Sequence, residues 1–429
     1  MPVSMNSGNN TLTTGKSKLL TSLMFVFIVS FGGGALLFNV QLGTINLHAF
    51  RIVLLVSSFI FLVQGYFRKL RSGPEKYFIL MCVLWVLFAA VSFRWSLVTK
   101  YAWKDVYYVV SGGLMFFCLT VFSELPDFKK KFVSFWVLGY FINLVIAGWE
   151  IFTGSHFNSE YSQHLFNLRP EHFIHFAPAS VFGNPNLFSV YLVLSMTLFV
   201  ILRKHLSGFL FAFLMVSSLF LILYTHSKIS LLSTIPIAVY YFYSEAKFDF
   251  KSISRKSVGN NSLLLVIVIS GLFLFNDVVT PANQKGTPVS DKAPVLPKSE
   301  LIRKNLVFNG ITFFLDSRGR GIGAGQFQAY MEKGLNKYPT AGISNPHSGI
   351  IEILSEYGII GIALVVFFYL GLMIYTIRHF GLRNSWVTML CILELILLSN
   401  ANSGFLSSSV SWMVMIVPVI FLPEARTDN

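Results

Sequence analysis

The sequence predicts an all-α, polytopic membrane protein with about twelve transmembrane helices. Of its 429 residues, 54% are hydrophobic and 12% are charged, whereas about one quarter of a soluble domain is charged. The apolar residues also gather in repeated runs of about 20, the length that crosses roughly 30 Å of hydrocarbon as a helix. The net charge of +14 is explained by basic cytoplasmic loops, so we expect no nucleic acid partner.

The apolar runs follow one another along the chain in a single orientation. The expected spans are 19–38, 45–66, 77–93, 105–122, 132–152, 186–202, 206–225, 229–243, 262–276, 348–377, 385–400 and 408–423. The first run lacks the cleavage site of a signal peptide and is interpreted as a spanning helix. Lys and Arg gather in alternate connections, which predicts that both termini lie in the cytoplasm.

Two extracytoplasmic segments are too long to be turns, 153–181 and 276–347. In the second segment, residues 299–315 place apolar side chains at helical spacing, with Arg303 and Lys304 on the polar side. This pattern predicts an amphipathic helix on the outer membrane surface. The predicted units are transmembrane helices 1–9 with the first loop (1–275), an extracytoplasmic catalytic loop (276–347) and transmembrane helices 10–12 (348–429).

The strongest candidate for catalysis is His347, in the stretch Asn345-Pro346-His347-Ser348. It stands immediately before a long apolar helix, so it lies at a helix N-terminus and at a membrane surface. The helix dipole disfavours a protonated imidazole there, which favours a neutral histidine that can accept a proton. An interfacial or capping histidine is the alternative interpretation.

Glu352 and Glu356 lie four residues apart on one face of the helix that follows. Glu352 is about one turn beyond His347, and we expect its carboxylate to hydrogen-bond and orient the imidazole. Carboxylates also stabilise helix N-termini, so capping is the alternative. We interpret Gly358 and Gly361 as points where another helix packs closely.

Basic residues gather in the same outer segment. Arg318 and Arg320 flank the start of a glycine-rich stretch, 319–325, and Arg303 and Lys304 precede it. Backbone N–H groups and guanidinium groups in such a stretch are suited to binding an anion. Solvated loop arginines are the alternative. Because no parallel strand precedes it, the stretch is not a dinucleotide-binding motif.

Two further cations, Arg51 and Lys228, lie at the ends of expected spans. Charges at a membrane are costly and therefore indicate function, although snorkelling to the headgroups is the alternative. In the 153–181 loop, His172 and His175 match no zinc pattern, so we expect no metal and no cofactor.

The segment Phe182-Gly183-Asn184-Pro185-Asn186 precedes the sixth span. An asparagine at this Pro-Asn turn is predicted to cap the helix. The Asn186 side chain is also a candidate for contact with a sugar hydroxyl.

Three motifs resemble the O-antigen ligase and polymerase superfamily of membrane glycosyltransferases, which includes teichuronic acid polymerases. His347-Ser348, nine residues and then Gly358-x-x-Gly361 is similar to the family's His-[Asn/Ser/Gln]-x9-Gly-x-x-Gly pattern. Residues 321–327 are similar to its Gly-x-Gly-x-x-x-Phe run, and 182–186 to its Asn-Pro-Asn helix entry. The resemblance covers most of the chain, with its specific part at about 300–365.

Two basic positions can be compared with the family. Arg303 matches a family arginine at the start of the surface helix, whereas the family commonly has Ser-Arg where this chain has Ser227-Lys228. Lysine keeps the charge but loses the bidentate geometry of arginine, so this position departs from the family's pattern.

The resemblance implies a substrate and a mechanism. The donor would be an oligosaccharide on undecaprenyl diphosphate at the outer face of the bacterial cytoplasmic (inner) membrane. A general base would activate a hydroxyl of a glycan acceptor, giving metal-independent transfer with inversion. The implied roles are catalytic for His347, Glu352 and Glu356, diphosphate-binding for Arg303, Arg318, Arg320, Lys228 and Arg51, and glycan-binding for Asn184, Asn186 and Ser348.

Three functions fit these features. The first is polymerisation of lipid-linked repeat units into a surface polysaccharide, with membrane lipids, a flippase and a chain-length regulator as partners. A ligase that attaches the glycan to lipid A–core or another acceptor shares the same chemistry. A transporter of lipid-linked oligosaccharides is the third, but it predicts midplane charges and inverted repeats, and the sequence has mainly interfacial charges and no repeat.

Overall fold

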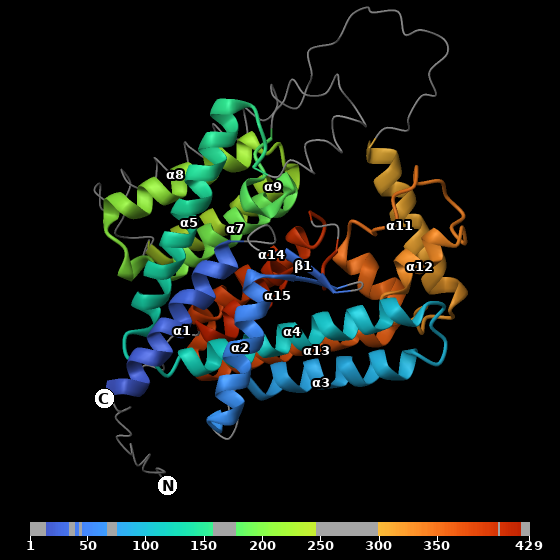
Figure 1. Ribbon diagram of the computed structural model, residues 1–429, viewed down its shortest axis with the longest axis horizontal. Helices are drawn as coiled ribbons and strands as arrows, with labels where there is room; N and C mark the ends of the chain where they lie inside the picture. The colour runs from blue at the N-terminus through green and yellow to red at the C-terminus, as the bar shows by residue number, and fades with distance from the viewer. Residues whose placement is uncertain are drawn as a thin grey trace, which may run out of the picture.

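The computed structural model describes residues 14–33, 39–42, 45–66, 75–157, 177–245, 299–401 and 404–421. These residues are almost entirely α-helical (Figure 1), which confirms the predicted class. The α-helices are α1 (Thr14–Gly32), α2 (Ala49–Val63), α3 (Glu75–Ser92), α4 (Thr99–Phe122), α5 (Phe128–Thr153), α7 (Pro185–Ile201), α8 (Gly208–Tyr224), α9 (Lys228–Glu245), α11 (Ser299–Asp316), α12 (Gln326–Glu332), α13 (Gly349–Asn384), α14 (Trp386–Leu398) and α15 (Ser409–Ile420). Two 3-10 turns are η3 (Ser180–Phe182) and η4 (Arg203–His205).

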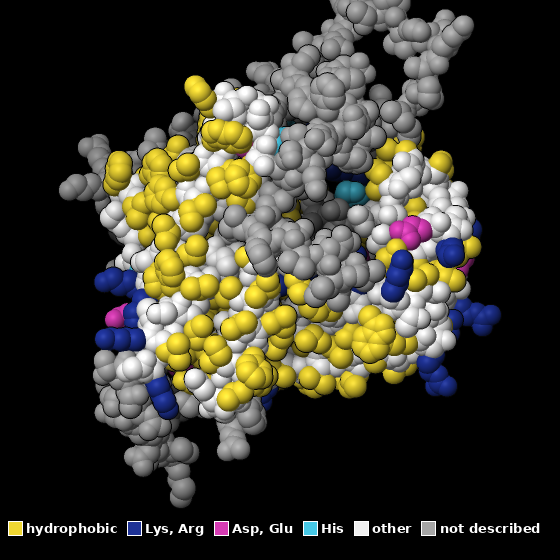
Figure 2. Space-filling view, in the orientation of Figure 1, with side chains coloured by type: hydrophobic (Ala, Val, Ile, Leu, Met, Phe, Trp, Pro, Cys, Tyr) yellow, Lys and Arg dark blue, Asp and Glu magenta, His cyan; other side chains and the backbone are white. Residues whose placement is uncertain are grey.

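The helices are those of a membrane protein. Within the described residues, five helices are long and apolar enough to cross a membrane, namely α1, α3, α4, α5 and α13, and α2, α7, α8, α14 and α15 are shorter apolar helices. Large apolar side chains are exposed along them, as Figure 2 shows, and Val63 and Phe367 are both 70% exposed. Such extensive apolar surface fits contact with lipid.

Each expected span except one coincides with a helix. The exception, 262–276, lies outside the described residues, so the total of twelve spans stays a prediction.

Two local expectations were wrong. The first concerns β1 (Asn39–Leu42) and β2 (Ile45–His48), which form an antiparallel hairpin in which β2 occupies the start of the span expected over 45–66. Apolar and polar residues alternate along both strands, and a period of two is typical of a strand.

The second concerns α13, which was expected to be one continuous helix over 348–377. Its backbone leaves the helical conformation at Gly358 (φ 61°, ψ −152°) and at Gly381 (φ 76°, ψ 166°). Both conformations are open to glycine and strained for other residues. The break at Gly358 creates room for a loop described below.

Helix boundaries follow the expected capping rules. The Asn184 side chain accepts a hydrogen bond from the Asn186 N–H at 2.8 Å, and Pro185 occupies the first turn of α7. This confirms the predicted cap. At the end of α5, Gly154 adopts a left-handed conformation (φ 64°) that terminates the helix.

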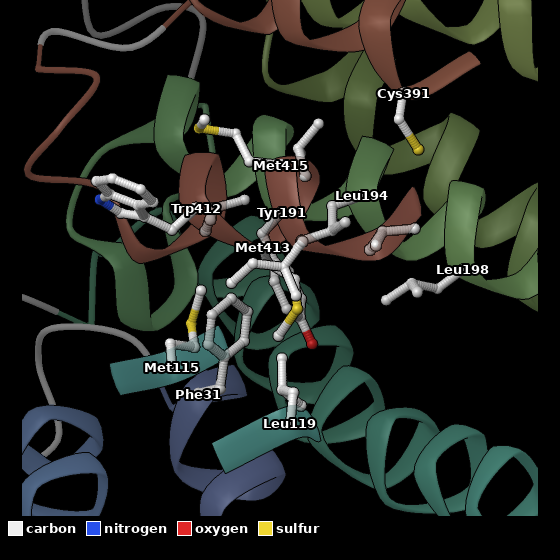
Figure 3. Packing of buried hydrophobic residues seen from close by; sticks show 14 of the residues in the cluster. Phe31, Met115, Leu119, Tyr191, Leu194, Leu198, Cys391, Trp412, Met413 and Met415 are labelled. Atoms are coloured by element: carbon white, nitrogen blue, oxygen red, sulfur yellow. The ribbon is translucent and has the colours of Figure 1, made fainter. Parts of the chain in front are cut away.

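The core is formed by helices that are distant in the sequence. α3 packs against α4 and α13, and Figure 1 shows these three helices side by side with α11 and α12 at one end. In Figure 3, Phe31 of α1, Met115 and Leu119 of α4, Tyr191 of α7 and Met413 of α15 converge in one buried apolar cluster.

A smaller cluster holds α11 against the protein. Ile302, Leu306 and Phe313 of α11 are buried with Phe327 and Met331 of α12. The apolar side chains that α11 leaves exposed are Leu301, Phe308, Ile311 and Leu315. The expected helix is thus present, while its position on a membrane surface stays a prediction, as does the division of the chain into three units.

Candidate active site

Two asparagines of α11 hold the loop that leads to His347. The Asn305 side chain donates to the Pro339 carbonyl at 2.7 Å. Asn309 donates to the Tyr338 carbonyl at 2.8 Å and accepts from the Tyr338 N–H at 2.9 Å. Both asparagines are buried, so these bonds form in a low-dielectric environment and fix the loop firmly.

His347 itself is half-buried and has a left-handed backbone (φ 52°). Residues with side chains rarely adopt this conformation, and functional sites are where it concentrates. Burial, and next the positive charge of Arg303, lower the pKa of His347 from its ordinary value of 6.5. The imidazole is therefore neutral at pH 7. A neutral imidazole was expected from the sequence, but from the helix dipole as its cause.

Ser348 ties the start of α13 to the end of α14. Its hydroxyl donates to the Asn400 side-chain oxygen at 2.7 Å, and the Gly349 N–H donates to the Ser399 carbonyl at 2.7 Å. The Ser348 hydroxyl keeps lone pairs that can accept a bond from a sugar hydroxyl. Its contact with glycan stays a prediction.

Glu352 does not orient His347, contrary to expectation. Its carboxylate accepts hydrogen bonds from the N–H groups of Phe405, at 2.6 Å, and Leu406, at 3.5 Å. The side chain is buried. Glu352 therefore anchors the turn between α14 and α15, because both of its oxygens face that backbone.

Glu356 anchors a second loop in the same way. One carboxylate oxygen accepts from the Gly325 N–H at 3.1 Å and the other from the Phe327 N–H at 2.9 Å. Its backbone carbonyl accepts from the Gly323 N–H at 3.0 Å. The side chain is buried, so one residue of α13 fixes the end of the glycine-rich loop and the start of α12.

The break in α13 receives this loop. The Ile359 N–H donates to the Gly319 carbonyl at 2.9 Å, and a Cβ at Gly358 would lie 2.2 Å from the same oxygen. Gly358 thus permits a close approach, as predicted, but the approaching segment is a loop and not a helix. The sequence could not distinguish an approaching helix from an approaching loop, because either one requires a residue without a side chain at this position.

The loop does not offer its backbone to an anion, and this part of the expectation was wrong. Every N–H group from Gly321 to Phe327 donates to an acceptor within the protein. Gly321, Gly323 and Gly325 have φ values of 84°, 110° and 67°. The glycines are therefore needed because the loop backbone adopts positive φ angles at these positions. The anion-binding groups that remain are the exposed side chains of Arg318 and Arg320.

The aromatic surface beside this loop was not anticipated. The Arg320 guanidinium lies 5.2 Å from the centre of the Trp95 ring, which belongs to the turn between α3 and α4. Gln326 exchanges hydrogen bonds of 2.9 and 3.1 Å with the backbone of Val98 in the same turn. The α3–α4 turn is therefore part of the site's framework.

Arg51 is buried and contacts the same turn that Glu352 binds. Its guanidinium donates to the Ser407 carbonyl at 3.1 Å and lies over the rings of Tyr107 and Tyr108, at 5.3 and 4.8 Å from their centres. Through these contacts, Arg51 holds the turn between α14 and α15 in place. Its predicted contact with a diphosphate stays a prediction.

Asn184 and Asn186 lie next to the helix that starts at Lys228. The Ser189 hydroxyl donates to the Asn186 carbonyl at 2.7 Å and lies 2.7 Å from the Ser230 hydroxyl of α9. Lys228 is exposed as the first residue of that helix. The starts of α7 and α9 are thus joined by hydroxyl groups.

Asp105 of α4 is a polar residue that sequence reasoning missed. It is 6% exposed, and the Tyr357 hydroxyl donates to its carboxylate at 2.7 Å. The Asp105 carboxyl group also neighbours that of Glu356. A lone aspartate in an apolar run was the available signal, because a buried charge at a membrane indicates a specific role.

Among the residues that the structure describes, no group of three or more His, Cys, Asp and Glu side chains is placed to hold a metal ion. His172 and His175 lie outside the described residues.

Together these features define a polytopic α-helical membrane protein with a half-buried histidine and exposed arginines at one end. A family model described as O-Antigen ligase matches residues 187–366. The teichuronic acid biosynthesis protein TuaE of Bacillus subtilis (strain 168) is 24% identical over 361 residues, which cover 81% of this chain and 72% of that protein. Both findings agree with the resemblance to O-antigen ligases and polymerases that the motifs indicated.

Proposed function

We propose that this protein polymerises glycan repeat units, taking them from undecaprenyl diphosphate at the outer face of the bacterial cytoplasmic membrane. The observation that carries the proposal is His347, because a neutral and half-buried imidazole beside Arg303 combines a base with a binding group for an anion. The similarity to a teichuronic acid biosynthesis protein supports a polysaccharide product.

In the proposed reaction, the His347 imidazole accepts the proton of an acceptor sugar hydroxyl. The hydroxyl oxygen then forms a bond to the anomeric carbon of the donor, and the bond from that carbon to the diphosphate oxygen breaks. Undecaprenyl diphosphate leaves with the bonding electrons. A single displacement of this kind inverts the configuration at the anomeric carbon.

The leaving diphosphate gains negative charge as its bond to the sugar breaks. Arg303, Arg318 and Arg320 are exposed at the end that carries His347, and guanidinium groups bind phosphate oxygens in pairs. Stabilising charge that develops in the transition state lowers the barrier. We assign these three residues to the diphosphate, with Lys228 and Arg51 as further candidates, and we propose a metal-independent reaction.

The buried carboxylates have a supporting part in this proposal. Glu352 and Glu356 each bind two backbone N–H groups, so they act through the loops that they hold. Ser348, Asn184 and Asn186 are proposed to contact the glycan, because their polar groups lie at helix N-termini.

A ligase is the second candidate, because the matching family model is described as O-Antigen ligase. It would use the same base and the same donor, and transfer the completed glycan to lipid A–core or another acceptor. A flippase that delivers the donor and a chain-length regulator are proposed partners in either case.

The products of purified protein distinguish the two candidates. Wild-type protein is incubated with undecaprenyl-diphosphate oligosaccharide and a chelator, with and without lipid A–core. A ladder of longer lipid-linked glycans, formed from the donor alone, is the result that polymerisation predicts. Consumption of donor only when lipid A–core is present would identify a ligase, and no consumption in either mixture would contradict both.

A further inference from the structure

Two carboxyl groups lie side by side in the interior, those of Asp105 in α4 and Glu356 in α13. Their side chains are hydrogen-bonded to each other, and only 6% of Asp105 and 4% of Glu356 is exposed. The Tyr357 hydroxyl donates to Asp105 at 2.7 Å. The Gly325 N–H, which donates to Glu356 at 3.1 Å, also contacts Asp105. The pair therefore joins α4, α13 and the end of the glycine-rich loop.

A hydrogen bond between two carboxyl groups requires a proton on one of them, because an ionised carboxylate can only accept. Two adjacent buried carboxylates would also repel each other strongly. The positive charge of Lys104 acts on Asp105, but among the described residues no Lys or Arg side chain forms an ion pair with Asp105 or Glu356. The two side chains therefore share a proton.

The contacts of the two side chains indicate which one carries this proton. Each oxygen of Glu356 accepts a backbone N–H, one from Gly325 at 3.1 Å and the other from Phe327 at 2.9 Å. Two such donors favour the ionised form. Asp105 accepts the Tyr357 hydroxyl at its Oδ2 atom, so its Oδ1 atom is the one that can carry the proton to Glu356. Asp105 is thus the donor of the pair and Glu356 the acceptor.

We propose that Asp105 is a positioning residue of the site: its protonated carboxyl group donates to Glu356 and so allows Glu356 to hold the glycine-rich loop from the interior. This role rests on the proposed function, because the loop follows Arg318 and carries Arg320, which are assigned to the diphosphate. A carboxylate that is buried without such a donor is strongly destabilising. Loss of the donor would weaken the hold of Glu356 on the loop and shift both arginines.

Matched substitutions of the two carboxyl groups should have unequal effects on transfer. In Asp105→Asn, the amide N–H replaces the carboxyl O–H as donor to Glu356, and the amide oxygen accepts the Tyr357 hydroxyl. In Glu356→Gln, one amide oxygen must serve two backbone N–H groups. With purified undecaprenyl-diphosphate oligosaccharide, Asp105→Asn should therefore keep kcat/KM within about twofold of wild type. Glu356→Gln should lower it at least about tenfold.

Asp105→Leu is the variant that removes the donor at similar side-chain size. It leaves the Glu356 carboxylate buried without its partner and the Tyr357 hydroxyl without its acceptor, so kcat/KM should fall at least about tenfold. Rescue of this loss by asparagine, an uncharged residue, would show that position 105 supplies a hydrogen-bond donor and not a charge.

Infrared spectroscopy of the full-length protein at pH 7 detects the shared proton without any transfer step. A protonated carboxyl group has a C=O stretching band that an ionised carboxylate lacks. The spectrum of wild type minus that of Asp105→Asn should contain this band. The control is Asp316→Asn, which replaces a carboxylate that is 62% exposed and lies 3.6 Å from Lys337. Its difference spectrum should contain no such band.

Three results would overturn the inference. Absence of the band from the Asp105→Asn difference spectrum would exclude the shared proton. Equal loss of transfer in Asp105→Asn and Asp105→Leu would show that a charge is needed at position 105. Wild-type kcat/KM in Glu356→Gln would show that the loop does not need both oxygens.

The inference can be judged even if wild-type protein transfers no glycan, a result that would contradict the proposed function alone. The infrared band is then still expected, and thermal unfolding in detergent replaces the transfer rate. Asp105→Asn should unfold at the wild-type temperature, and Glu356→Gln at a temperature lower by roughly 2–4 °C. Equal unfolding temperatures of these two variants would contradict the unequal roles of the two carboxyl groups.

Discussion

His347 combines three properties that the surrounding residues impose. Its left-handed backbone (φ 52°) is held by a loop that Asn305 and Asn309 fix from α11. Burial lowers the pKa of the imidazole, and the Arg303 charge lowers it further. A base that is neutral at pH 7 and adjacent to a cation is suited to a reaction in which an anion leaves.

The pH dependence of activity follows from these causes. The pKa of His347 lies below 6.5, so the base form persists as the pH falls below that value, and activity is lost only as the pH drops through the shifted pKa. Arg303→Gln removes a positive charge that opposes protonation. The acidic limb of kcat/KM should therefore move to higher pH, toward 6.5, in addition to any loss of rate.

The neighbouring cation provides the control for this measurement. Lys304→Gln removes the same charge from the same turn of α11, and Lys304 is not among the groups that shift the pKa of His347. Its acidic limb should stay at the wild-type pH. An identical limb in Arg303→Gln and wild type would contradict the assigned role of Arg303.

The sequence was sufficient to propose His347 as the base, which stays a prediction, and insufficient to place its neighbours. The histidine stands next to proline in a recognisable motif, so local information identifies it. Glu352 was assigned to His347 by helical spacing, yet it binds Phe405, which lies 53 positions further along the chain. Asn305 and Asp105 were missed for the same reason, because their partners are set by tertiary packing.

At the scale of elements, the break in α13 couples the helix to the glycine-rich loop. The backbone of Gly358 has φ 61° and ψ −152°, a region that is essentially restricted to glycine. Its partners are loop backbone atoms, which cannot move aside as a flexible side chain would. The position of Arg318 and Arg320 therefore depends on a glycine that carries no chemistry itself.

Gly358→Ala should destabilise the protein by about 3 kcal/mol and abolish transfer, because strain adds to a clash with the backbone of the loop. The matched control is Gly371→Ala in the same helix, where a Cβ meets nothing within 4 Å. That variant should stay within about 1 kcal/mol of wild type. Thermal unfolding in detergent measures both.

A Gly358→Ala protein as stable and active as Gly371→Ala would show that the loop does not depend on the break.

Most elements follow from local patterns in the sequence, since long apolar runs coincide with helices and an asparagine, Asn184, caps α7 as predicted. The hairpin at 39–48 and the break at Gly358 did not follow. The break arises where a helix adapts to a loop from another part of the chain, whereas the hairpin pairs two neighbouring strands whose alternating pattern was overlooked beside the apolar runs.

At the scale of the whole molecule, the site draws on helices outside the matching family region. That region covers residues 187–366. Two residues that bind it come from the preceding part of the chain: Asp105 accepts a hydrogen bond from Tyr357, and Val98 donates one to Gln326. Arg51 comes from α2 and holds the turn that Glu352 also binds. The amino-terminal helices thus complete the framework that holds α12, α13 and the turn between α14 and α15.

The measurement that tests the account most directly is the transfer rate of His347→Ala with purified undecaprenyl-diphosphate oligosaccharide. Its control is His205→Ala, which removes an exposed histidine from the turn between α7 and α8. We predict that His347→Ala unfolds at the wild-type temperature and is slower by about 10²–10⁴-fold, the usual contribution of a general base. His205→Ala should keep the wild-type rate. A folded His347→Ala protein that transfers glycan as fast as wild type would contradict the proposed mechanism.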